Sequence, residues 1–261
     1  MAEPPKTPLL LIRGLMREQR HWGDFIRVLQ LQFPLADIIT LDLPGNGHLY
    51  ESASPKTIAD MTEALRQQLT PLQRASPLNL IALSMGGMIA IDWMARYPKE
   101  IATGVLINTS VGHYAPFYQR LRWQNYLIFL KMGWQSPAQR EQAILGLTSN
   151  FERDNAELLK NWQCWQQQYP VSGENAFNQL LASALFNPIK KPLHPLLIIT
   201  STADHLVDYY CSVRLHQAWQ TAFAQHDTAG HDLPLDDPLW VSQMIKNWLD
   251  SLISQVFYLG I

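Results

Sequence analysis

The residue with the clearest chemical potential is Ser84, which lies in the segment Ala82-Leu83-Ser84-Met85-Gly86-Gly87. The apolar run before it predicts a strand, and the residues after it predict a helix. A tight turn from strand to helix exposes a serine hydroxyl and leaves backbone N–H groups free to bind an oxyanion. The segment therefore fits a nucleophile, although a serine at a helix N-cap would give the same pattern.

Two later segments could supply the partners of such a nucleophile. Asp204 follows the apolar run 196–201, and His231 follows the run 222–226. In a parallel sheet the loops after each strand open at the same edge, so Ser84, Asp204 and His231 can converge. A base activated by an acid would let the serine attack a carbonyl carbon.

The elements that must position these side chains alternate along the chain. Short apolar runs and amphipathic stretches follow one another, which predicts an α/β fold with about six mostly parallel strands flanked by helices. The expected strands span 9–12, 37–41, 78–83, 101–108, 196–201 and 222–226, and the expected helices span 21–33, 57–69, 86–97, 207–219 and a final one from Asp237-Pro238.

The alternation stops between residues 112 and 187, where helix starts occur without a convincing strand. We interpret 112–187 as a helical cap inserted into a core domain formed by 1–111 and 188–261. The insertion holds 13 of the 27 aromatic residues. This excess predicts an aromatic-walled substrate cavity, with Trp123 and Trp162 as substrate-binding candidates, although aromatics that only pack the cap would give the same count.

Composition limits the function classes. The 261 residues carry a net charge of -2, only 16% are charged, and 47% are hydrophobic. This balance argues against a nucleic-acid binder and against a membrane-surface binder, because the affinity of both comes largely from clustered Lys and Arg. Cys164 and Cys211 are too few for a disulfide framework, and the run 9–12 is too short for a signal peptide or a membrane span. We expect a cytoplasmic protein with a small-molecule partner and an oligomeric state that the sequence does not define.

With these segments in view, the sequence resembles the α/β-hydrolase fold family, specifically its capped branch of small bacterial serine esterases of the pimeloyl-ester hydrolase type. The resemblance covers nearly the whole chain and includes Leu10-Leu-Ile-Arg-Gly-Leu15 and Leu41-Asp-Leu-Pro-Gly-Asn-Gly47. It implies a serine hydrolase that cleaves an ester or thioester without a cofactor. The aromatic, lightly charged cap predicts that the acyl group is small and mainly apolar. The resemblance also implies that the N–H groups of Leu15 and Met85 form the oxyanion hole.

The sequence departs from this family at three places. Ala82 replaces the first glycine of the G-x-S-x-G turn, Arg13 stands where a histidine is usual, and we expect the family's first two strands to be missing ahead of Leu9. Arg13 could bind an acidic group of the substrate or brace the loop through a buried partner. Bracing is the favoured reading, because buried arginines are commonly paired.

Other readings are weaker. His226 falls inside a strand, His48 in a loop and Asp208 inside a helix, so none replaces the proposed acid or base. The histidines and aspartates of 226–232 lack metal-ligand spacing, and Tyr50 interrupts a dinucleotide-type glycine pattern, so we expect no metal and no nucleotide. A lyase or carbon–carbon hydrolase using the same three residues remains open, with Arg13 as its only cation candidate, as does a non-catalytic ligand-binding relative.

Overall fold

The structure, a computed structural model, describes residues 8–259, so the start of the predicted core domain at residues 1–7 and its last two residues lie outside it. Six strands form one sheet in the order β2-β1-β3-β4-β5-β6. All five neighbouring pairs are parallel. The strands are β1 (Leu9–Ile12), β2 (Ile38–Thr40), β3 (Leu78–Leu83), β4 (Ile101–Ile107), β5 (Leu196–Ser201) and β6 (Ala222–His226).

Both faces of the sheet are covered by helices, which is why its central strands are apolar at successive positions. Leu10 and Ile12 of β1 pack on one face with α2 (Ile58–Gln68), α3 (Met85–Arg96) and α9 (Tyr210–Trp219). Leu9 and Leu11 point to the other face and pack with α1 (Phe25–Gln32) and α11 (Pro238–Leu259). Alternate side chains of a strand thus build two cores, one on each side.

The helix predicted over 21–33 is shorter than expected. A 3₁₀ turn covers Gln19–Trp22, and α1 begins only at Phe25. Between them Gly23 has a φ of 51°, a left-handed conformation that interrupts a helix. Asp237-Pro238 begins the last helix as predicted, and the short α10 (Leu233–Asp236) was not foreseen.

The chain between β4 and β5 contains only helices and loops within residues 112–187. They are α4 (Phe117–Arg120), a 3₁₀ turn (Trp123–Asn125), α5 (Tyr126–Met132), α6 (Pro137–Thr148), α7 (Ala156–Gln168) and α8 (Gly173–Leu185). Side-chain caps begin three of them, as at Ser136 of α6, where Ser136 and Gln139 form a capping box. We call 112–187 the helical segment.

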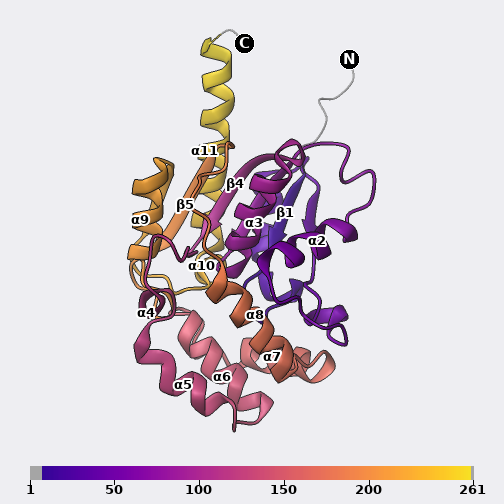
Figure 1. The fold of residues 1–261 in the computed structure, drawn as a ribbon, viewed down its shortest axis with the longest axis vertical. Helices are drawn as coiled ribbons and strands as arrows, with labels where there is room; N and C mark the ends of the chain where they lie inside the picture. The colour runs from indigo at the N-terminus through magenta and orange to yellow at the C-terminus, as the bar shows by residue number, and fades with distance from the viewer. Residues whose placement is uncertain (1–7, 260–261) are drawn as a thin grey trace.

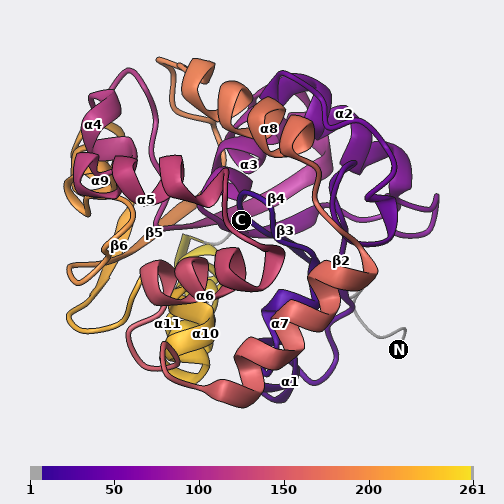
Figure 2. The same ribbon diagram turned by 90° about the horizontal axis from the view of Figure 1, so that it is seen from below.

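The helical segment lies at the end of the sheet opposite the start of β1 and the last turns of α11 (Figure 1). Because the chain enters β1 from the N-terminal end and all strands are parallel, their carboxyl ends face this segment. Seen from below, α5, α6, α7 and α8 spread across that end of the molecule (Figure 2). The loops that carry the predicted catalytic side chains therefore open toward it.

Within residues 8–259, helices of sufficient length and hydrophobicity to traverse a bilayer are lacking.

Candidate active site

Ser84 occupies a strained turn between β3 and α3. Its φ of 57° and ψ of -119° are unusual for a residue with a side chain, and such strain costs roughly 1–3 kcal/mol. The turn is held by Ser84 N–H, which donates to Ile107 O at 2.8 Å, and by Thr109 Oγ1, which donates to Ser84 O at 2.8 Å. This geometry matches the strand–turn–helix context expected for an exposed nucleophile.

The glycine after Met85 lets α3 approach the end of β1. A Cβ placed on Gly86 would come within 2.3 Å of Ile12 O and 2.8 Å of Arg13 O. No side chain fits there, so the glycine is needed to bring the loop after β1 next to Ser84. Ala82, the departure from the usual motif, is fully buried in β3.

Asp204 and His231 are in direct contact at the edge of the sheet. Asp204 Oδ2 lies 2.7 Å from His231 Nδ1, and both residues are at least 96% buried. Asp204 Oδ1 accepts from the N–H groups of Leu206 and Val207 at 2.7 and 2.9 Å. Because a carboxylate only accepts, Nδ1 carries the proton and Nε2 is left as the basic nitrogen.

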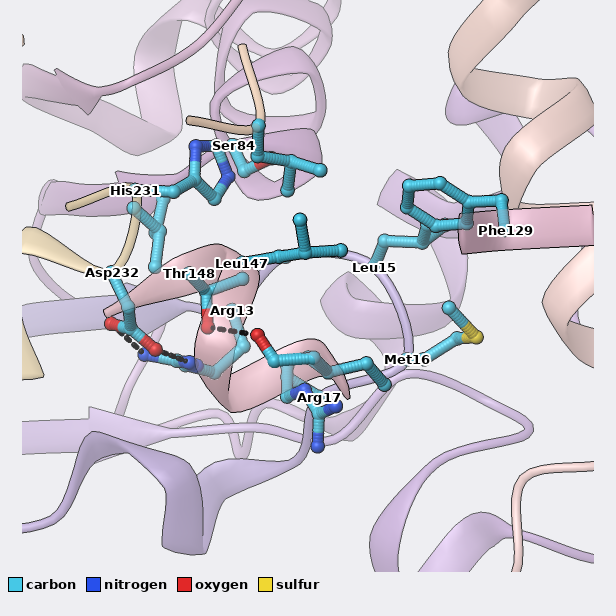
Figure 3. A pocket seen from close by; sticks show the side chains of 14 residues that line it. Arg13, Leu15, Met16, Arg17, Ser84, Phe129, Leu147, Thr148, His231 and Asp232 are labelled. Atoms are coloured by element: carbon cyan, nitrogen blue, oxygen red, sulfur yellow. Dashed lines mark hydrogen bonds and ion pairs between the residues drawn. The ribbon is translucent and has the colours of Figure 1, made fainter. Parts of the chain in front are cut away.

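The imidazole and the serine meet at one cavity (Figure 3). Within residues 8–259, His231 is hydrogen-bonded through Nδ1 to Asp204, and no hydrogen bond joins it to the Ser84 hydroxyl. Such contacts often tighten only when substrate is bound.

The predicted oxyanion donors lie beside the serine. Leu15 follows Arg13-Gly14 in the loop after β1 and lines the cavity, whereas Met85 is the first residue of α3. Among the described residues, neither N–H donates to another group of the chain. Free N–H groups at a helix start favour negative charge, so this corner of the cavity suits a developing oxyanion.

The cavity has an empty volume of about 560 Å³, including the part open to solvent. Most of its wall is aliphatic, and its aromatic contribution comes from Phe129 of α5. The apolar lining consists of Gly14, Leu15, Met16, Leu83, Phe129, Ile144, Leu147 and Leu206, and the polar lining of Arg13, Arg17, Ser84, Thr148, His231 and Asp232.

The two aromatic residues predicted to bind substrate, Trp123 and Trp162, do not line this cavity. Trp123 is 63% exposed, outside the core. Trp162 is 1% exposed and packs against His21 and the Arg17 guanidinium. Helical spacing of aromatics cannot tell the inner face of a covering helix from its outer face.

Arg13 has a buried partner, as expected if it braces the loop and does not bind an acidic group of the substrate. Its guanidinium forms a buried bidentate pair with Asp232, with N–O distances of 3.0 and 2.5 Å, and stacks over Trp22. The pair connects the loop after β1 to the residue that follows His231. Its charge is thereby compensated beside the cavity.

Arg17 is a cavity residue that the sequence did not single out. It is 93% buried, and its Nη1 donates to Glu141 Oε2 of α6 at 2.7 Å. Nη1 also lies 2.9 Å from His21 Nε2. Burial, followed by the charge of Arg17, lowers the pKa of His21 well below its usual value, so His21 is neutral in the fold.

Asn108 was also missed, although it joins three segments of the site. Its amide donates to His231 O at 2.8 Å, and its Oδ1 accepts from Ser201 N–H at 2.9 Å. It has a φ of 46°, a conformation that asparagine tolerates better than most residues. An asparagine directly after a buried strand was the available signal.

The rival residues have other partners. His226 accepts from the N–H groups of Thr228 and Ala229 and packs against Trp240, as expected for a structural histidine. Asp208 accepts from Tyr210 N–H at the start of α9. Over residues 8–259, no group of three His, Cys, Asp or Glu side chains is arranged to hold a metal ion.

Comparison with known proteins identifies the family of this chain. A family model described as "Alpha/beta hydrolase family" matches residues 9–244. The chain belongs to the α/β-hydrolase family. It is similar to the biotin biosynthesis bifunctional protein BioHC of Teredinibacter turnerae, with 25% identity across 95% of this chain and 45% of that protein.

A shorter match, 33% identical over 34% of this chain and 33% of the relative, is to a pimeloyl-[acyl-carrier protein] methyl ester esterase of Chromobacterium violaceum. This α/β-hydrolase chain spans less than half the length of these curated relatives.

Solved structures share the fold. An esterase from Thermogutta terrifontis has a TM-score of 0.70 at 19% identity, covering 94% of this chain and 90% of that one. The esterase RhEst1 from Rhodococcus has a TM-score of 0.72 at 16% identity, covering 95% and 91%. The predicted family and fold class are confirmed.

Proposed function

We propose that this α/β hydrolase is a serine hydrolase that cleaves the ester or thioester of a small, mainly apolar acyl group. The observation that carries the proposal is the buried Asp204–His231 contact at the same cavity as the strained Ser84 turn. Esterases among its relatives and structural neighbours support the same class of reaction.

In the proposed reaction His231 Nε2 takes the proton of Ser84 Oγ while Oγ attacks the carbonyl carbon. Asp204 stabilises the imidazolium, and the N–H groups of Leu15 and Met85 bind the oxyanion. Collapse of the intermediate breaks the bond to the leaving alcohol or thiol, which takes the proton from His231. Water, deprotonated by His231, then releases the acid and restores Ser84.

The cavity supports an uncharged acyl group. Its wall is mostly aliphatic, and both of its arginines are already paired, Arg13 with Asp232 and Arg17 with Glu141. A carboxylated substrate would have to compete with these buried partners for the cations. The lyase reading depended on Arg13 being available, and the Asp232 pair weakens it.

The first test is Ser84→Ala, assayed with p-nitrophenyl esters of increasing chain length. We expect turnover to fall by about 10⁴-fold or more, and labelling by a fluorophosphonate probe to be lost. Ser242→Ala, which removes another buried hydroxyl, should leave both intact. Near-full ester turnover by Ser84→Ala would refute the mechanism.

The same panel separates the alternatives. Neutral esters should be cleaved faster than esters with a carboxylate at the end of the acyl chain, and the reverse order would contradict the uncharged pocket. Labelling of Ser84 without turnover of any ester would favour the lyase or carbon–carbon hydrolase. A wild-type chain that is not labelled would favour a ligand-binding relative.

A further inference from the structure

The helical segment exposes large apolar side chains over a short stretch of chain. Seven of them fall between residues 117 and 134, and each is at least 37% exposed. We call them the outer apolar surface: Phe117, Tyr118, Trp123, Tyr126, Leu127, Leu130 and Trp134. A monomeric protein rarely exposes so many neighbouring large apolar groups without a partner for them.

Three of these residues share one side of α5. Tyr126, Leu127 and Leu130 stand at i, i+1 and i+4, which at about 100° per residue fall within one third of the helix circumference. Trp123 lies in the 3₁₀ turn before α5, and Trp134 follows its end. The opposite side of α5 faces inward, because Met132 is buried and Phe129 lines the active-site cavity. α5 therefore separates the cavity from an apolar exterior.

Charge distinguishes this stretch further. No aspartate or glutamate occurs from residue 101 to residue 140, whereas Arg122 and Lys131 fall among the apolar residues. Lys131 is exposed, and no ion pair involves it within the described part of the chain. Tryptophan, tyrosine and leucine beside basic groups are typical of segments that lie in the interface of a phospholipid layer.

Two residues of this surface, Phe117 and Tyr126, also line a groove. Its apolar lining includes Leu121, Leu180 of α8 and Met88 of α3, and its polar lining consists of Ser110, Arg120 and Ser183. A chain of methylene groups that left a lipid layer at α5 would meet apolar groups in this groove. The arrangement fits an acyl substrate better than a polar one.

We propose that the outer apolar surface docks the protein on a phospholipid surface, from which the acyl ester reaches the cavity under α5. The second half of this statement rests on the proposed hydrolase function, whereas docking does not. The interaction is mainly apolar, with phosphate groups near Lys131 as a smaller electrostatic contribution. It needs no clustered basic patch, which the composition excludes.

The test is cosedimentation of the full chain with phosphatidylcholine vesicles and with vesicles containing one quarter phosphatidylglycerol. We expect wild type and Ser84→Ala to bind equally, and Leu127→Ser/Leu130→Ser to bind about tenfold or more weakly. The matched control is Leu31→Ser/Leu72→Ser, which removes two exposed leucines from the core domain and should bind like wild type.

Turnover of soluble p-nitrophenyl butyrate is measured in parallel, to show that the two double-leucine variants are folded and to test the hydrolase function separately. Wild type that does not bind either vesicle would overturn the proposal, as would equal binding by the two double variants. Sedimentation velocity shows whether the protein forms a dimer. If wild type is a dimer that Leu127→Ser/Leu130→Ser dissociates, and wild type does not bind vesicles, then a second copy of the chain covers the outer apolar surface. That result would overturn the lipid assignment.

Discussion

The sheet and the helical segment use the same kinds of residues in opposite ways. Leu80 and Trp93, in β3 and α3, are both 0% exposed, whereas Leu127 and Trp134, on and after α5, are 68% and 79% exposed. In the sheet domain apolar side chains build two cores that hold the loops carrying Ser84, Asp204 and His231. In the helical segment many of them face outward, so their abundance there reflects a surface as well as a core.

This contrast explains why the wall of the cavity beside Ser84 is not mainly aromatic. The aromatic excess of 112–187 is real, but Phe129 is the aromatic residue that this segment contributes to the cavity wall. A strand buried on both faces leaves no choice of side, whereas a helix covering a cavity has an inner and an outer face. Composition does not report which face a residue occupies.

The largest expected effect concerns the site held by the sheet. Asp204→Asn should lower kcat by about 10³–10⁴-fold, because the amide can no longer hold the imidazole in the tautomer with a basic Nε2. Steady-state kinetics on a p-nitrophenyl ester measure this. Asp208→Asn, which changes a carboxylate at the start of α9, is the control and should retain activity. Equal losses in both variants would contradict the assigned acid.

Next in size is the buried pair that joins the loop after β1 to the residue after His231. Arg13→Met leaves Asp232 charged and buried without its partner, which should lower the free energy of unfolding by about 3–5 kcal/mol. Urea denaturation followed by circular dichroism measures it. Arg27→Met, which breaks an exposed pair with Asp24, should leave the urea concentration at the midpoint of unfolding unchanged. An Arg13→Met variant as stable as wild type would contradict the conclusion that Arg13 stabilises the loop after β1.

Truncation of one leucine in each region tests the contrast between the buried core of the sheet and the exposed surface of the helical segment. Leu80→Ala should lower the free energy of unfolding by about 2–5 kcal/mol, because it opens a cavity in a packed core. Leu127→Ala should change it by no more than about 0.5 kcal/mol, as expected at an exposed position. Thermal and urea denaturation of both variants give the values. A large loss for Leu127→Ala would mean that α5 packs inward.

The smallest effect lies where the two regions meet, at His21. Its pKa is lowered in the fold by burial and by Arg17, whereas the unfolded chain binds a proton near pH 6.5. The unfolded state therefore gains protons first, so the free energy of unfolding is constant above about pH 7 and falls as the pH drops through 6.5. At pH 5.5 the loss from this group is at most about 1.4 kcal/mol, the limit for a histidine that binds its proton in the unfolded chain alone.

Urea denaturation of wild type and His21→Gln at pH 7.5 and 5.5 measures this contribution. The variant should lose less stability between the two pH values than wild type does. His113→Gln, at an exposed position, is the matched control and should follow wild type. Identical pH dependence in wild type and His21→Gln would show that His21 is not the titrating group.

Much of the fold followed from local patterns. The runs 78–83, 196–201 and 222–226 are strands with the predicted bounds, and the Thr57 cap begins α2 as expected. These features depend on residues near one another in the chain, such as apolar runs between turn signals. The strained turn at Ser84 was visible for the same reason, since small residues and glycine next to a strand end leave few alternatives.

The sequence by itself determined the α/β class, the strand-end placement of Ser84, Asp204 and His231, and the low charge of the chain. Tertiary structure alone decided that Arg13 pairs with Asp232, 219 positions away, and that Arg17 pairs with Glu141 of α6, 124 positions away. It also decided which side of α5 faces the cavity. Such outcomes depend on packing between distant segments, where the position of a side chain is set by its neighbours in space and not by its neighbours in the chain.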